Sequence, residues 1–209
     1  DVFSYVGGWG IQAAVAGAAS VMCVDSSGPA LEHAHAAAEL NGVAEQFATL
    51  EGDAFEALKS LKLERERYDV IVCDPPAFIK RKKDFKEGAL AYRRINELAM
   101  SLLDRDGLLV ACSCSHHVER ATFAETLLAA SRHLDRSLVF LESGQPGPDH
   151  PVHPAIPETE YLKAFYGRVL PACSLTRQRR RGVDWVEARR SVKGFSPRPL
   201  ANPRSLDEL

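Results

Sequence analysis

The sequence has no long apolar run, and it has little methionine, tryptophan and cysteine. A membrane-spanning helix needs roughly 18 consecutive apolar residues, so we expect no such helix and no membrane partner. The chain opens at Asp1 without a basic or apolar leader, which argues against a secretory signal. Its five cysteines are odd in number and scattered, which argues against a disulfide framework and favours a reducing, cytoplasmic location.

The chain also lacks an initiator methionine, and residues 1–4 read as a strand already under way. We therefore expect a fragment whose N-terminal part is missing. The 209 residues, 45% of them hydrophobic and 26% charged, are enough for one globular domain with a real core. The sequence gives no signal for an oligomeric state.

The net charge of −2 hides an asymmetry between two regions. Residues 174–209 hold nine Lys and Arg against four Asp and Glu, and the rest of the chain holds 17 against 24. A basic tail can contact nucleic acid, but Arg, Pro and Ser with weak periodicity favour disorder. We expect a folded domain over 1–171 and a basic, disordered tail over 172–209.

Predicted strands and helices alternate along the domain, and strand 68–73 is continuously apolar, as in a strand covered on both faces. This alternation predicts an α/β fold, a doubly wound sheet with helices on both faces. The predicted strands are 1–4, 20–24, 47–50, 68–73, 108–112, 138–141 and 161–169, and the predicted helices are 11–19, 28–41, 54–66, 89–103 and 118–134.

Polar or glycine residues follow five of these strands. Ligands of such sheets bind beyond the carboxyl ends of the strands, so these residues should meet at one rim. This convergence is the main functional signal. The residues are the Gly7-Gly8 turn, Asp25, Asp53, Asp74 and Cys114.

The first half of this rim suggests a nucleotide site. A glycine turn before a helix lets a ligand approach the backbone, although many such turns need glycine for geometry alone. Asp25 is placed to accept ribose hydroxyls and Asp53 to read an adenine amino group; the alternative for both is helix capping. The dinucleotide fingerprint G-x-G-x-x-G is not met, because Ala13 stands at its last glycine, and this favours S-adenosylmethionine over nicotinamide cofactors.

The second half of the rim suggests chemistry on a base. Asp74-Pro75-Pro76 follows the strongest strand, and its prolines stiffen the backbone and leave carbonyls free to accept. The Asp74 carboxylate can engage a base, and Phe78 offers a face for stacking. The alternative is that the prolines only end a strand and that Phe78 belongs to the core.

At these motifs the chain resembles the class I S-adenosylmethionine-dependent methyltransferases of bacterial large-subunit ribosomal RNA, of the cytosine-5 type. The resemblance covers residues 1 to about 170, in the expected order. It is carried by DVFSYVGGWG (1–10), VDSS (24–27), ELNG (39–42), GDAF (52–55), YDVIVCDPPAF (68–78), AYRRIN (91–96), SCS (113–115), DHPV (149–152) and YLKAF (161–165).

The resemblance implies a seven-stranded methyltransferase sheet, ribosomal RNA as partner and an N-terminal RNA-binding portion outside this chain. It also implies that Cys114 is the nucleophile and that Asp74 faces the cytosine. It places the cofactor at Tyr5, Gly7, Gly8, Asp25, Ser26, Asp53, Ala54, Asp74 and Pro75. Pro76 and Phe78 are assigned to the RNA substrate. Arg93 and Asn96, one turn apart on a predicted helix with Tyr92 alongside, fit either a wall of the RNA pocket or a solvated helix face.

The reaction that the resemblance implies explains the need for a cysteine. A thiolate that adds to cytosine C6 makes C5 nucleophilic, and a thiol with a pKa of about 8.5 must first be ionised. The group that ionises it stays open among His116, His117, Arg93 and the substrate. Many cytosine-5 RNA methyltransferases carry a second cysteine after the proline, but Ala77 stands near that place, so we expect one-cysteine chemistry with Cys112 in the core.

Other interpretations remain at this point. They are a methyltransferase for another base, such as guanine N7 or N2, a non-catalytic RNA-binding module, and a nicotinamide oxidoreductase. The basic run 80–83 suits phosphate contacts or a solvated loop equally. His150 and His153 resemble a weak metal pair without further ligands, so we expect no metal.

Overall fold

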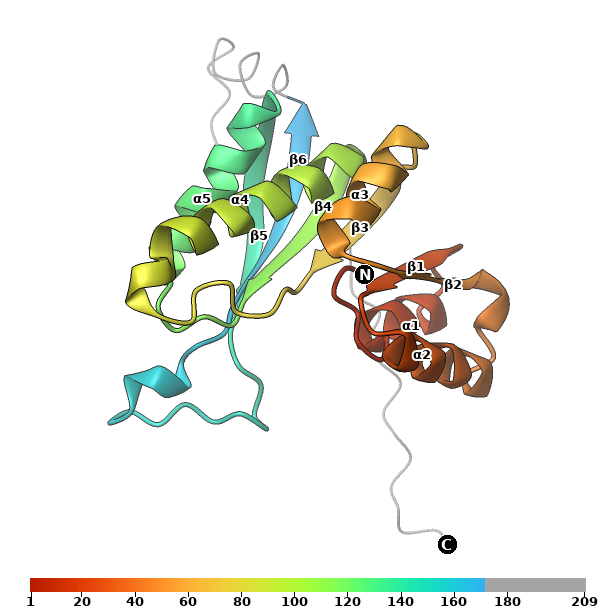
Figure 1. Cartoon of the computed structure of the whole chain (residues 1–209), viewed down its shortest axis with the longest axis horizontal. Helices are drawn as coiled ribbons and strands as arrows, with labels where there is room; N and C mark the ends of the chain where they lie inside the picture. The colour runs from red at the N-terminus through yellow and green to blue at the C-terminus, as the bar shows by residue number, and fades with distance from the viewer. Residues whose placement is uncertain (172–209) are drawn as a thin grey trace, which may run out of the picture. The chain divides into compact units, whose positions relative to one another are not determined.

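The computed structural model describes residues 1–171, so the tail expected over 172–209 lies outside the described residues. Helices and strands alternate over most of this range, as the sequence predicts (Figure 1). The helices are α1 (Gly8–Val15), α2 (Gly28–Leu40), α3 (Ala54–Leu63), α4 (Phe85–Leu102) and α5 (Arg120–His133). The strands are β1 (Val21–Asp25), β2 (Phe47–Glu51), β3 (Tyr68–Cys73), β4 (Leu103–Ser113), β5 (Arg136–Gly144) and β6 (Lys163–Pro171).

A single residue connects the two halves of the sheet. β1 pairs in parallel with β2, and the other strands follow the order β3-β4-β6-β5. Val2 forms parallel bridges to Val24 on one side and to Cys73 on the other. The strand expected over 1–4 is reduced to this bridge, because Phe3 and Tyr5 have φ angles of 63° and 49° and turn the backbone out of the extended region.

The second half of the sheet ends in an antiparallel strand pair. β3 and β4 run parallel, whereas β6 runs antiparallel to both β4 and β5. The carboxyl ends of β3 and β4 therefore lie at the same edge as the beginning of β6. Figure 1 shows that the long β5–β6 connection extends from this edge.

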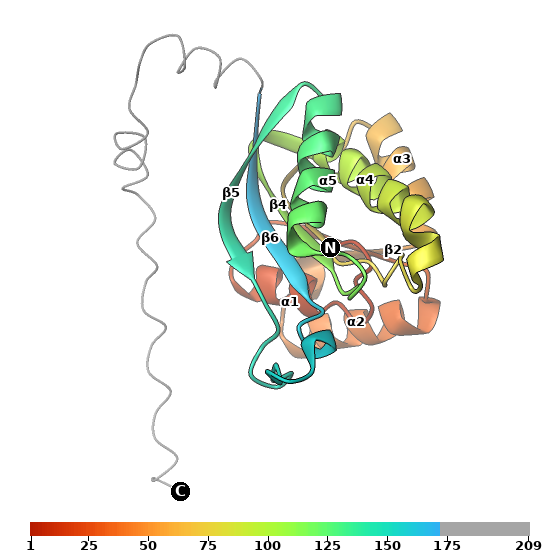
Figure 2. The same cartoon turned by 90° about the vertical axis from the view of Figure 1, so that its left-hand side faces the viewer.

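Two apolar cores hold helices against the sheet. α3, α4 and α5 pack against β3 and β4 around Ile95, Met100 and Phe123, all three fully buried. Figure 2 shows these three helices together on one side of the sheet. α1 and α2 form a separate core with β1 and β2, which includes Cys23 and Phe47. The predicted doubly wound α/β architecture is thus observed, with an antiparallel pair at one edge.

Most element boundaries lie close to those predicted, with three clear exceptions. α1 begins at Gly8, inside the glycine turn, rather than at residue 11. α4 begins at Phe85, so the expected basic loop ends in a 3-10 turn, η2 (Lys82–Asp84), and a first helical turn. β4 begins five residues early because its first residue, Leu103, already pairs with Tyr68. Two further 3-10 turns are η1 (Ala44–Gln46) and η3 (Pro157–Thr159).

Membrane-spanning helices and disulfide bonds were both expected to be absent, and the structure can be compared with these expectations over residues 1–171. None of the helices in this range is long and apolar enough to cross a membrane. The cysteines of the same range, at positions 23, 73, 112 and 114, are all free, and only Cys114 has appreciable exposure.

Gly88 allows α4 to approach the loop that follows β3. A methyl group at this position would lie 2.2 Å from Ile79 Cγ1 and 2.8 Å from the Phe78 carbonyl oxygen. Both distances are shorter than van der Waals contact, and the carbonyl belongs to the backbone, so the loop would have to move. The glycine therefore fixes the distance between α4 and the segment 75–79.

We expect Gly88→Ala to lower the free energy of unfolding by about 1–3 kcal/mol, because overpacking outweighs the roughly 1 kcal/mol helix-propensity gain. Urea denaturation followed by circular dichroism measures this change. Gly8→Ala is the matched control, because an added methyl at Gly8 meets no atom within 4 Å. A stability of Gly88→Ala equal to or above that of the control would contradict the close-approach argument.

Candidate active site

The ends of β3 and β4 meet in a pocket closed by the β5–β6 connection. Asp74, Pro75 and Pro76 supply one wall, and Cys114 supplies the next. The register pairs Cys73 with Ala111, so Cys114 lies beyond the strand end and further along than a position directly opposite Asp74. The remaining wall comes from Pro146, Gly147, His150, Tyr161 and Leu162.

The Cys114 thiol is half-buried and faces the proline loop. Its Sγ lies 3.9 Å from the Pro75 carbonyl oxygen, to which the thiol can donate. Burial raises the pKa of this thiol, and the neighbouring Asp74 carboxylate acts in the same direction. Lys163 and the backbone N–H groups of Ala77 and Cys114 oppose this effect and favour the thiolate.

Asp74 also sits in a partly desolvated position. Burial raises the pKa of its carboxyl above the usual range, and a hydrogen bond from the Trp9 side chain lowers it. Trp9 was not among the predicted site residues; it lies in the first turn of α1, next to the glycine turn. This contact joins the glycine half of the rim to the proline loop.

Cys112 and Cys73 are buried in the sheet, as expected for structural cysteines. Burial raises the pKa of Cys73 to about 12 and raises that of Cys112 still further. A buried thiol with such a pKa is not ionised near neutral pH. Cys114 is therefore the one cysteine of residues 1–171 with both access and proximity to a cation.

Packing explains two of the three glycines in the glycine turn, and the third leaves room for a ligand. Gly7 adopts φ 77° as N-cap of α1, where an added Cβ would touch Ala34 at 3.0 Å. Gly10 packs α1 against Cys23 of β1, where an added Cβ would lie 2.4 Å from the sulfur. Gly8 differs, since the space beside it is open. Packing thus requires Gly7 and Gly10, while Gly8 leaves an accessible face.

Asp25 holds the turn in place and does not cap the next helix. One of its carboxylate oxygens accepts from the Tyr5 backbone N–H at 2.8 Å, and the other accepts from Ser27 at 2.9 Å. Ser27 is the N-cap of α2, with its hydroxyl 3.4 Å from the Ala30 nitrogen. Tyr5 and Ser26 are exposed beside this carboxylate. Each carboxylate oxygen keeps a further lone pair for a ligand hydroxyl.

Asp53 fulfils the capping alternative considered for it. Its Oδ1 accepts from the backbone nitrogens of Phe55 and Glu56 at 3.0 and 3.2 Å, which makes it the N-cap of α3. Its neighbour Ala54 is buried in the core and offers no exposed side chain. Capping does not exclude a ligand contact, because the side chain remains exposed at the rim.

Phe78 and Tyr92 support the proline loop through aromatic packing. Their ring centroids lie 4.8 Å apart, and Phe78 also contacts Phe3 and Phe55 at 6.2 and 6.1 Å. Tyr92 is 1% exposed, and its hydroxyl accepts from the Phe78 backbone nitrogen at 3.4 Å. Tyr92 therefore stands behind the loop and, contrary to the expectation, does not form an open wall for RNA. Phe78 keeps partial exposure.

Arg93 and Asn96 also differ from the expected pocket wall. Asn96 is fully buried and donates to the Tyr92 carbonyl at 2.8 Å. Arg93 pairs with Glu97 at 2.7 Å and contacts His133 of α5 at 3.1 Å. Asn96 therefore supports α4 from inside the core, and Arg93 joins α4 to α5. Helical spacing predicted a shared surface but could not tell which face the core would cover.

The other singled-out polar residues make local contacts. Arg81 forms an ion pair with Asp84 at 2.9 Å inside the basic segment. The ring centroids of His116 and His117 lie 3.7 Å apart with their planes tilted by 44°, whereas His150 lines the pocket of Cys114. No group of three or more His, Cys, Asp or Glu that could hold a metal occurs within residues 1–171.

Lys163 is, after Trp9, a second residue of this site that sequence reasoning missed. It is 4% exposed, and its Nζ donates to the carbonyl oxygen of Ser115, next to Cys114. A lysine at the start of an apolar strand is normally assigned to solvent. The motif YLKAF gave a signal, but its role required knowledge that β6 runs beside β4.

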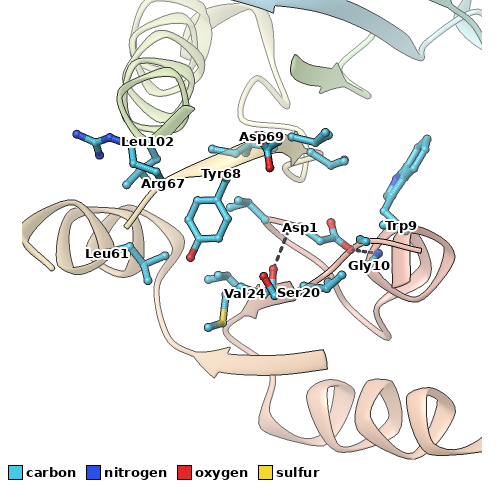
Figure 3. Close-up of a pocket in the computed structure, with 18 of the residues that line it drawn as sticks. Asp1, Trp9, Gly10, Ser20, Val24, Leu61, Arg67, Tyr68, Asp69 and Leu102 are labelled. Carbon is cyan, nitrogen blue, oxygen red and sulfur yellow. Dashed lines mark hydrogen bonds between the residues drawn. The ribbon is translucent and has the colours of Figure 1, made fainter. Parts of the chain in front are cut away.

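A separate cavity opens at the other end of the strands and contains none of the predicted catalytic residues. It is lined by the first residues of β1 and β3, by Leu61 and Leu102, and by the first turn of α1 (Figure 3). It exists because only Val2 inserts between β1 and β3, so their earlier residues do not pair with each other. Asp1, Arg67 and Asp69 also line this cavity, and Trp9, which contacts Asp74, lies between it and the rim.

Comparison with known proteins gives similarity over most of the described residues. The chain is 37% identical over 173 residues to ribosomal RNA large subunit methyltransferase I of Vibrio cholerae, covering 81% of this chain and 44% of that protein. It is 35% identical over 167 residues to a Methanocaldococcus jannaschii protein provisionally named as a ribosomal RNA large subunit methyltransferase, covering 79% and 42%. The chain thus spans less than half the length of these relatives.

A family match and a solved structure extend this result. Residues 1–85 match the family described as RNA cap guanine-N2 methyltransferase. The structure of SMU.776, provisionally named as a methyltransferase and crystallised with SAH, aligns with a TM-score of 0.71 at 23% identity. It covers 80% of this chain and 43% of that one. The fold of residues 1–171 is therefore the class I methyltransferase fold, as predicted.

Removal of the Asp74 charge should make Cys114 easier to ionise. Because the carboxylate raises the pKa of the thiol, we expect Asp74→Asn to lower that pKa. The pH midpoint of Cys114 alkylation by iodoacetamide, read by peptide mass spectrometry, measures the shift. Asp69→Asn, at the other end of β3, should leave the midpoint unchanged; an unchanged or raised midpoint in Asp74→Asn would refute the coupling.

Proposed function

We propose that this chain is the catalytic domain of an S-adenosylmethionine-dependent methyltransferase that acts on C5 of a cytosine in large-subunit ribosomal RNA. The observation that carries the proposal is the pocket shared by Cys114 and Asp74 at the carboxyl edge of the sheet. The similarity to large-subunit ribosomal RNA methyltransferases supports the substrate class. The activity of the longer relatives is not transferred as a whole, because the chain spans only part of them.

Cys114 fits the role of a nucleophile better than any other thiol of residues 1–171. It is accessible, stands beside a cation, and faces the pocket that a base could enter. Addition of its thiolate to C6 of cytosine would place electron density on C5, which could then bond to the methyl carbon as the bond from that carbon to the cofactor's sulfonium sulfur breaks. A base removes the C5 proton, the C5–C6 double bond re-forms and the thiolate leaves.

Asp74 is proposed to bind the opposite edge of the same ring. Thiolate addition to C6 increases the negative charge at N3, and a proton shared with a carboxyl group stabilises that charge. Burial raises the pKa of Asp74, which favours such sharing. The rigid Pro75-Pro76 backbone and the exposed Pro76 ring would position the base, with Phe78 beside it.

The residues of the glycine half fit an adenosine with a short charged tail. The fit rests on the open space beside Gly8, on the Asp25 carboxylate, fixed by two backbone N–H groups, and on exposed Asp53. S-adenosylmethionine, when bound, supplies the methyl group. Tyr5, Gly7, Ser26, Ala54, Asp74 and Pro75 complete the proposed binding residues. Burial of Ala54 restricts its part to its backbone.

A second candidate function is methylation of guanine N2. The observation in its favour is the family match over residues 1–85, which includes the Asp74-Pro75-Pro76 segment. That match ends before Cys114, and an exocyclic amine needs no thiol for activation. Nucleoside analysis of methylated RNA separates the two functions, because one yields 5-methylcytidine and the other N2-methylguanosine.

Trapping on modified RNA tests the nucleophile directly. We expect the protein, with S-adenosylmethionine and ribosomal RNA containing 5-fluorocytosine, to form a covalent adduct at Cys114, since fluorine cannot leave as the C5 proton does. Mass spectrometry of the crosslinked peptide locates the bond. Cys114→Ala should lose the adduct and Cys112→Ala should keep it, whereas methyl transfer persisting in Cys114→Ala would sink the assignment.

Calorimetry tests the cofactor half separately. We expect Asp25→Ala to weaken binding of S-adenosylhomocysteine at least tenfold, since a charged acceptor of two hydroxyls contributes about 1.5–3 kcal/mol. Glu64→Ala is the matched control, because Glu64 is an exposed acid at the far end of α3. Equal affinity in Asp25→Ala and in the control would remove Asp25 from the ribose site.

A further inference from the structure

Lys163 is a buried lysine that the topology brings beside Cys114. It is the first residue of β6 and pairs in register with Ser113, the last residue of β4. Its Nζ donates to the Ser115 carbonyl oxygen, while 96% of the residue's surface is covered. One backbone pairing and one side-chain hydrogen bond therefore fix the amine on both sides of Cys114.

Within the described part of the chain, this amine has no carboxylate counter-ion. None of the ion pairs within residues 1–171 includes Lys163. The two ionisable groups that act on it are the Cys114 thiol and the Arg120 guanidinium, and only the thiol favours its charged form. Arg120 is itself bound to the Ser143 hydroxyl at 2.6 Å and the Gly144 carbonyl at 3.0 Å. A buried ammonium without a carboxylate is costly, so the sulfur is its natural partner.

We infer that Lys163 is a positioning residue that sets the charge state of Cys114, its ammonium stabilising the thiolate that attacks the base. The inference rests on the proposed nucleophile, but the coupling of the two groups is a property of the free protein. It assigns an ionising group from β6, whereas the candidates by sequence were His116, His117, Arg93 and the substrate.

The balance of charges explains why a lysine suits this place. Burial and the Asp74 carboxylate raise the pKa of Cys114, and burial lowers the pKa of Lys163 to about 8. Transfer of one proton from sulfur to nitrogen converts a thiol and an amine into a thiolate and an ammonium. In the thiolate–ammonium state the two opposite charges neutralise each other, so the thiolate is not an isolated buried charge.

The other titratable groups around the pair lie on different elements. Asp74 at the end of β3 and Cys112 of β4 act on the thiol side, and the Tyr92 hydroxyl of α4 lies within its electrostatic reach. His150 and Tyr161 line the same pocket. Because all of them are retained when Lys163 alone is changed, a shift in the titration of Cys114 reports on the lysine.

The first test is the pH profile of Cys114 alkylation by iodoacetamide, read on the peptide that contains Cys114. We expect Lys163→Met to raise the pH midpoint by about one unit, because an adjacent positive charge is lost. Lys163→Arg keeps a cation, so its pH midpoint should stay near that of the unchanged protein. Lys62→Met, on the exposed end of α3, is the control. Coinciding midpoints for Lys163→Met and the unchanged protein would overturn the inference.

A reciprocal test leaves Lys163 in place and so does not depend on the folding of its variants. If the thiolate favours the ammonium, Cys114→Ala must lower the pKa of Lys163 further. NMR titration of ¹³Cε-labelled lysine measures this, and an unchanged Lys163 titration would overturn the coupling. Neither test uses RNA, so a coupled pair with methyl transfer intact in Cys114→Ala would refute the proposed function while leaving the pair itself established.

Discussion

The parallel pairing of β3 with β4 fixes the position of every candidate catalytic group. Val72 pairs with Val110 and Cys73 with Ala111, so the residues that follow both strands leave the sheet at one edge. Asp74 emerges from the first strand and Cys114 from the second. The antiparallel return of β6 along β4 then brings Lys163 to the same edge. A shift of one residue in either register would turn these side chains to the other face.

Desolvation and neighbouring charges together set the protonation state of Cys114. Burial disfavours the thiolate of Cys114, and the Asp74 carboxylate adds to the cost. An isolated thiol in such a place would stay protonated at neutral pH. A buried lysine in the same place would tend to lose its proton. The ammonium of Lys163 lowers the pKa of Cys114 and the thiolate raises that of Lys163, so the charged form of each group stabilises that of the other.

Much of the fold followed from local patterns. β3 has the predicted bounds, because Val70–Cys73 is a continuous apolar run and Asp74-Pro75 ends it. The convergence of Asp74 and Cys114 was also predictable, since parallel strands share a carboxyl edge. The burial of polar residues on α4 was not predictable in the same way. Tyr92 and Asn96 are polar in sequence, yet α4 turns both inward, where they bond to backbone groups. Lys163 was missed for the related reason that only the strand order places it beside Cys114.

The division of the chain at about residue 85 has a chemical meaning. The match to guanine-N2 methyltransferases covers the glycine turn, Asp25, Asp53 and the proline loop, which are the groups proposed to hold the cofactor and one edge of the base. Cys114 and Lys163 both lie beyond it. The proposed nucleophile and its cation are therefore the groups that distinguish the proposed cytosine chemistry from guanine-N2 methylation, which needs no thiol.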